Sequence, residues 1–170
     1  MGFIVQSLNA CTVISVNADS YTGHATAEIK FTELDTGSVY TQILNYSGSP
    51  LSGQTNILVS DLPASNGAYK VSLYESGAEV ARRPLLLHCD IDCCLSKLTN
   101  ELIDCACDCP KCSSALAKAQ KVFLLLQSAL SSAELATTQL GSRNSGYYTD
   151  ILEKYLKAKS ICDNSCGCNC

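Results

Sequence analysis

The fold of the first half of the chain follows from the stretch Leu62-Pro-Ala-Ser-Asn-Gly-Ala-Tyr69-Lys-Val-Ser-Leu-Tyr74-Glu-Ser-Gly77. Residues that favour strands fill Ala68–Glu75, which is typical of an antiparallel strand with a buried face. Turn-forming residues stand on both sides of it, ending in Gly67 before the strand and Gly77 after it. The stretch therefore predicts a strand that turns through a hairpin into a last strand over Ala78–His88.

The same pattern repeats toward the N-terminus, where short apolar runs are separated by Asp, Asn, Ser, Gly and Pro. About seven such runs at this spacing predict an antiparallel β-sandwich over residues 1–90. The runs are Phe3–Ser7, Thr12–Asn17, Thr26–Glu33, Ser38–Asn45, Thr55–Ser60, Ala68–Glu75 and Ala78–His88.

The stretch around Tyr69 resembles the penultimate strand of immunoglobulin-like or fibronectin-like domains. The resemblance implies that Tyr69 takes the place of their corner tyrosine, whose hydroxyl bonds back to the preceding backbone. The chain has no tryptophan, and Cys11 is the one cysteine before residue 89. These features exclude the antibody-type core of a tryptophan on a disulfide.

Cysteines divide the chain in two, because eleven of the twelve follow residue 88. We therefore expect a cysteine-rich helical domain over residues 91–170, and an α+β protein as a whole. Eight of these cysteines fall into two clusters, which are Cys105, Cys107, Cys109, Cys112 and Cys162, Cys166, Cys168, Cys170.

Apolar residues in steps of three and four predict three helices in this half. The first is expected to be capped by Asp92, the second by Ser113 or Ser114, and the third to follow a loop over residues 141–146. The second helix has six apolar positions in heptad register, a pattern that favours packing against another helix within the chain or in a second copy. The predicted docking face comprises Leu116, Ala119, Phe123, Leu126, Leu130, Tyr148, Leu152 and Tyr155.

If the second and third helices pack antiparallel, the two cysteine clusters meet at one end of the hairpin. The sequence leaves three roles open for these cysteines: disulfides, a structural zinc site, or an iron–sulfur or metallothionein-like cluster. The two-residue gap between Cys109 and Cys112 is typical of a zinc-binding pair. Cys89, Cys93 and Cys94 are expected to form structural pairs near the junction or to be buried. Cys11 is predicted to be a buried small apolar residue.

Charge and motifs narrow the classes of function. The net charge of −4 lies on the first half, and neither half has the Lys and Arg stripe that phosphate backbones require, so nucleic acid is not expected. The chain lacks an apolar run of bilayer length and a signal sequence, which predicts a soluble protein made in a cytoplasm. Neither His24 nor His88 lies in a catalytic motif, so we do not expect an enzyme.

The second half resembles uncharacterised cysteine-rich virion proteins of tailed bacteriophages. The matching segments are Ile91–Leu98, Cys105–Cys112, Ala117–Leu126, Lys157–Lys159 and the terminal cysteines. The resemblance implies a structural role in the neck, tail or capsid-associated part of a particle, with other virion proteins or copies of itself as partners. The alternative is a zinc-binding or thiol-redox module, in which Cys109-Pro-Lys-Cys112 exchanges thiols and the sandwich recruits a partner.

Overall fold

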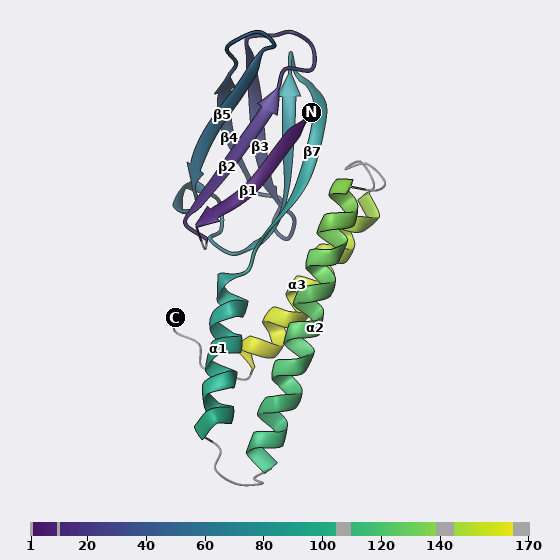
Figure 1. Cartoon of the computed structure of the whole chain (residues 1–170). Helices are drawn as coiled ribbons and strands as arrows, with labels where there is room; N and C mark the ends of the chain where they lie inside the picture. Colours follow the sequence, from purple (N-terminus) through teal and green to yellow (C-terminus); the bar gives the residue numbers. More distant parts are fainter. Residues whose placement is uncertain (1, 10, 105–109, 139–144, 165–170) are drawn as a thin grey trace.

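The computed structural model of this α+β protein describes residues 2–9, 11–104, 110–138 and 145–164. Seven antiparallel strands form the N-terminal half of this part of the chain, and three helices follow. Figure 1 shows the strands at one end of an elongated molecule and the helices extending away from them.

The strands form two antiparallel sheets. One has the order β1-β2-β5 and the other the order β4-β3-β6-β7. Their bounds are β1 Phe3–Asn9, β2 Val13–Asp19, β3 Thr26–Glu33, β4 Val39–Asn45, β5 Ser52–Leu58, β6 Gly67–Glu75 and β7 Ala78–Leu87.

One buried apolar cluster is shared by both sheets. Ile14 and Val16 on β2, Phe31 on β3, and Tyr69 and Val71 on β6 belong to it and are almost completely buried. Alternate residues of each strand point to the same face, so the two sheets face each other across this core. The expected antiparallel sheets are therefore present in the N-terminal half.

The fifth strand was predicted over Thr55–Ser60, which is wrong by three residues at its start. It begins at Ser52, and Val59–Asp61 form a short 3-10 turn instead of its end. Gly53 explains the difference, because a Cβ there would lie 2.6 Å from the Asn45 carbonyl oxygen. The glycine that weakens the sequence pattern is what lets the chain approach β4 so closely.

Three helices follow the strands: α1 Cys89–Asp104, α2 Pro110–Thr138 and α3 Ser145–Asp163. The predicted start of α1 after Asp92 is wrong, since the Asp92 N–H already donates to the His88 carbonyl oxygen at 3.0 Å. The start of α2 at Ser113 or Ser114 is wrong too, because Pro110 lies in its first turn, where a missing N–H costs no helical bond.

A second apolar cluster holds the helices together and against a sheet. Ile91 of α1, Leu126 of α2 and Ile151 of α3 are buried in it beside Ala68 of β6 and Leu86 of β7. Ala68 points to the opposite face of its strand from the neighbouring Tyr69, which lies in the first cluster. The helices therefore cover the outer face of β6 and β7, and the end of α2 runs beside β7 in Figure 1. The division of the chain near residue 90 into two domains stays a prediction.

Candidate functional site

Helix α2 has two apolar faces, and one of them packs inside the chain. Ala115, Val122, Leu126, Ala129 and Ala136 are buried and succeed each other in steps of seven, four, three and seven residues. Three of the five are alanines, which allow neighbouring helices to approach closely. This face contacts α1 and α3 in the second apolar cluster.

The other apolar face of α2 is exposed. Leu116, Phe123 and Leu130 are 46%, 50% and 40% exposed, and Leu124 is 66% exposed. The first three recur every seven residues, so they lie along one line of the helix surface. We call Leu116, Phe123, Leu124 and Leu130 the α2 stripe.

The remaining predicted docking residues lie elsewhere. Leu126, Tyr148 and Tyr155 are buried within the chain, and Ala119 and Leu152 are half-buried. The Tyr155 hydroxyl donates to Asp90 Oδ2 at 2.8 Å, which ties α3 to the start of α1. Burial, together with the nearby Asp90 carboxylate, raises the pKa of Tyr155, and burial raises the pKa of Tyr148 to about 12. Tyr148 and Tyr155 thus pack inside the chain, and the exposed stripe belongs to α2.

From Val122 to Ala133, the surroundings of the α2 stripe are uncharged. Exposed Gln120, Gln127 and Ser131 lie beside it, and the helix has no charged residue from Val122 to Ala133. Such a surface has little to offer a charged ligand. Its chemistry suits a protein surface that is apolar at the centre and uncharged at the rim.

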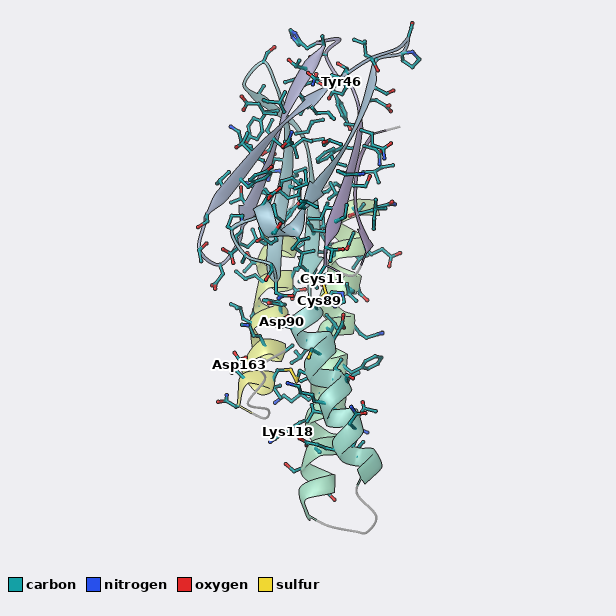
Figure 2. All side chains as sticks on the ribbon, turned by 90° about the vertical axis from the view of Figure 1, so that its left-hand side faces the viewer. Cys11, Tyr46, Cys89, Asp90, Lys118 and Asp163 are labelled. Carbon is teal, nitrogen blue, oxygen red and sulfur yellow. A yellow bond between two sulfur atoms is a disulfide. The ribbon has the colours of Figure 1, made fainter. Side chains whose placement is uncertain are left out.

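A disulfide joins the strands to the helices at their junction. Cys11, in the turn between β1 and β2, is bonded to Cys89 at the start of α1, with a Cα–Cα distance of 6.2 Å (Figure 2). The prediction that Cys11 is simply a buried apolar residue is therefore wrong. Strand β1 lies next to β7, and the end of β7 brings Cys89 to that turn, a proximity that the sequence spacing does not reveal.

A second disulfide fastens α1 to α3. Cys94 and Cys162 are both buried, and their Cα atoms are 5.8 Å apart. Cys93 is disulfide-bonded as well. Structural pairing near the junction or burial was expected for Cys89, Cys93 and Cys94, and all three are disulfide-bonded. Cys162 was grouped with the terminal cluster as a zinc ligand or a disulfide partner, and the structure places it in a disulfide, which leaves no thiolate for a metal.

The other clustered cysteines are not placed by the structure. Cys105, Cys107, Cys109, Cys166, Cys168 and Cys170 lie outside the described residues, and the side chain of Cys112 in the first turn of α2 is not described. The expectation that α3 returns toward the first cluster agrees with the described helices, because Asn164 and Ser114 line the same cavity. Whether the remaining sulfurs bind one another or zinc stays a prediction.

The sequence pattern gives no sign of a buried carboxylate, but the structure contains one. Glu75, at the end of β6, is 1% exposed. Its carboxylate accepts hydrogen bonds from the Tyr21 N–H at 3.0 Å, the Thr22 N–H at 2.8 Å, the Thr22 hydroxyl, and the Tyr46 hydroxyl at 2.9 Å. Burial alone would raise the pKa of Glu75, but these bonds hold it below its usual value. The group therefore secures the loop after β2 to the second sheet.

Comparison with known proteins identifies no relative of this chain. No protein-family model, curated protein or solved structure matches the chain. Within residues 2–9, 11–104, 110–138 and 145–164, no helix is both long enough and apolar enough to cross a bilayer.

Proposed function

We propose that this protein is a non-enzymatic assembly protein whose α2 stripe binds the same stripe of a second copy. One observation carries the proposal: Leu116, Phe123 and Leu130 are 40–50% exposed while aligned on one face of a helix. Exposed apolar residues in heptad register are the usual surface of a helix that packs against another helix.

Three residues of the stripe are symmetric about its centre, because Leu116 and Leu130 each lie seven residues from Phe123. In an antiparallel two-fold contact, Phe123 meets Phe123 and each Leu116 meets the other copy's Leu130. A contact in which one surface patch pairs with itself is the commonest symmetry of homo-oligomers. The absence of charge from Val122 to Ala133 favours this occupant, since a charged partner surface would lose solvation without gaining an ion pair.

The N-terminal half supplies the second part of the proposal, an immunoglobulin-like or fibronectin-like sandwich. The strand orders β1-β2-β5 and β4-β3-β6-β7 support it. So does Tyr69, whose hydroxyl donates to the Ala64 carbonyl oxygen and accepts from the Ala64 N–H at 2.9 Å. A tyrosine that bonds back to the backbone a few residues upstream marks these domains. Such sandwiches serve many binding functions, so the fold alone does not name the partner.

We propose that the protein is located in a phage virion, in its neck, tail or capsid-associated part. It rests on the resemblance of the second half to cysteine-rich virion proteins. Disulfides fit a particle that leaves the reducing cytoplasm, because an oxidising medium preserves them. Mass spectrometry of purified particles tests this location: the chain should be found in stoichiometric amount, and its absence from particles would exclude the role.

Replacing Phe123 by glutamate is expected to dissociate the dimer. The two new carboxylates would face each other at the centre of the contact, which should weaken self-association by at least about 100-fold. Sedimentation equilibrium of the full chain measures the effect. Leu58→Glu is the matched control, because Leu58 on β5 is equally exposed, at 53%, but lies on a sheet.

The expected outcome is a dimer for the natural chain and for Leu58→Glu, and a monomer for Phe123→Glu. A natural chain that stays monomeric at its highest soluble concentration would contradict the proposal. An equal loss of association in both variants would contradict it too, because the contact would then not be specific to α2.

A further inference from the structure

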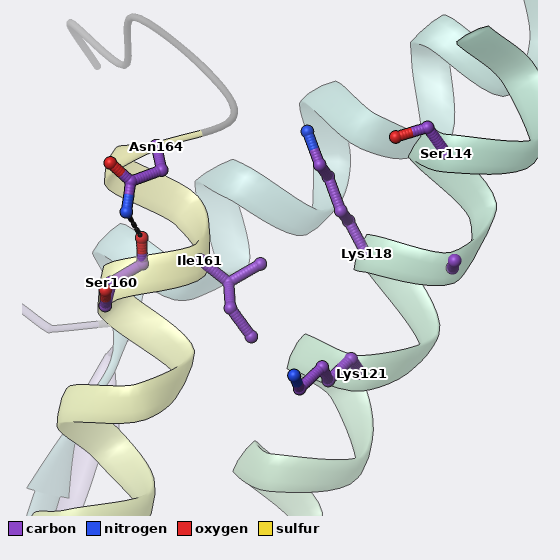
Figure 3. A pocket seen from close by; sticks show the side chains of 7 residues that line it. Ser114, Lys118, Lys121, Ser160, Ile161 and Asn164 are labelled. Atoms are coloured by element: carbon purple, nitrogen blue, oxygen red, sulfur yellow. Dashed lines mark hydrogen bonds between the residues drawn. The ribbon is translucent and has the colours of Figure 1, made fainter.

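A cavity of about 390 Å³ lies between the first part of α2 and the end of α3. Figure 3 shows Lys118 and Lys121 reaching from α2 toward α3, with Ile161 pointing toward them from α3. The cavity lies on a side of α2 between the buried face and the α2 stripe. Its lining residues are Ser114, Ala117, Lys118, Lys121, Ser160, Ile161 and Asn164.

The two lysines that line the cavity differ from the lysines of α3 in their ion pairing. Each lysine of α3 is paired with a carboxylate: Lys154 with Asp150 at 2.6 Å, Lys157 with Glu153 at 2.5 Å, and Lys159 with Asp90 at 3.2 Å. Lys118 and Lys121 have no carboxylate partner among the described residues, and no lining residue of the cavity is Asp or Glu. The described lining of the cavity therefore brings together two positive charges and no carboxylate.

The remaining lining residues add hydrogen-bond donors and apolar surface from both helices. Ser114 and Ser160 contribute hydroxyls. The Asn164 side-chain amide donates one N–H to the Ser160 carbonyl oxygen at 2.8 Å, which fixes the amide and leaves its second N–H for another acceptor. Ala117 and Ile161 supply the apolar surface.

We propose that this cavity binds a phosphate monoester whose ester group is apolar. A monoester carries close to two negative charges at neutral pH and three acceptor oxygens, which match two lysines with hydroxyl and amide donors. A carboxylate would neutralise one lysine and leave the other without a counter-charge. The apolar ester group would cover Ala117 and Ile161. The site is independent of the α2 dimer, since it uses a different side of the helix.

Titration calorimetry of the full chain with phenyl phosphate tests the proposal, with inorganic phosphate, benzoate and phenol as comparison probes. We expect phenyl phosphate to bind most tightly, inorganic phosphate and benzoate more weakly, and phenol not at all. Added NaCl should weaken the binding of phenyl phosphate. The double variant Lys118→Ala, Lys121→Ala should lower its affinity by at least about tenfold.

The charge-matched control is Lys70→Ala, Lys97→Ala, which removes the same charge from β6 and α1. It should keep the affinity of the natural chain, and circular dichroism should show both double variants folded. Absence of phenyl phosphate binding would overturn the proposal. Equal affinity for benzoate would overturn the assignment to a phosphate ester, and an equal loss in the control variant would overturn the assignment to this cavity.

Discussion

Replacing Cys94 and Cys162 together by alanine is expected to lower the free energy of unfolding by about 3 kcal/mol. The bond joins residues 68 positions apart, so its loss frees a long loop in the unfolded chain. Chain entropy alone would predict roughly 4 kcal/mol for such a loop, and the other cross-links of the chain reduce this figure. Alanine is the chosen replacement, because a serine hydroxyl at these buried positions would add a desolvation cost of its own.

Urea unfolding followed by circular dichroism at 222 nm measures this change in the helices. The matched control is Cys11→Ala, Cys89→Ala, which opens a loop of 78 residues and so has a similar entropic effect. Loss of Cys94–Cys162 should separate helix unfolding from strand unfolding, because this bond links α1 to α3 covalently, whereas Cys11–Cys89 links the strands to α1. Coincident transitions with an unchanged midpoint would show that apolar packing suffices to hold the helices.

Glu75→Gln is expected to destabilise the strands by about 3 kcal/mol at pH 7. The charged carboxylate accepts four hydrogen bonds, and bonds to a charged group contribute about 1.5–3 kcal/mol each. A glutamine amide can accept through only one oxygen, and its NH₂ group would face backbone N–H donors. The control is Glu28→Gln, where an exposed carboxylate 3.4 Å from Lys30 contributes at most about 1 kcal/mol.

The same residue sets a pH dependence. The pKa of Glu75 is lower in the folded chain than in the unfolded chain, so its contribution is complete above the ordinary glutamate pKa of 4.5. It is lost as the pH falls through the lowered folded value. Thermal unfolding between pH 7 and pH 3 should therefore show a steeper acid loss for the natural chain than for Glu75→Gln. Parallel curves for the two proteins would contradict the assignment of that loss to Glu75.

The strands were predictable because their signals are local. Alternation and turn residues located six of the seven strands to within a few residues, and the seventh differed where Gly53 allows a close approach to β4. Cys11 and Glu75 were misjudged for a different reason. Their partners, Cys89 and the loop at Tyr21, are distant in sequence and meet them only when the two sheets close.

The candidate docking face was predictable only in part. The steps of three and four placed Phe123 and Leu126 on one face, although Phe123 is exposed and Leu126 is buried. The buried side is marked by Ala115, Ala129 and Ala136, whose small side chains permit close helix packing but add little to an apolar pattern. The charged cavity could not be predicted either, because Lys118 and Lys121 on α2 line it together with Ile161 and Asn164, which are distant in sequence.

Site-specific photo-cross-linking from position 123 tests the central claim most directly. With benzoylphenylalanine in place of Phe123, irradiation of the full chain should give a product of twice the chain mass. Its cross-linked peptides should come from α2 of a second copy, centred on residues 116–130. Cross-links confined to one chain, or leading to the strands of another copy, would contradict self-association through the α2 stripe.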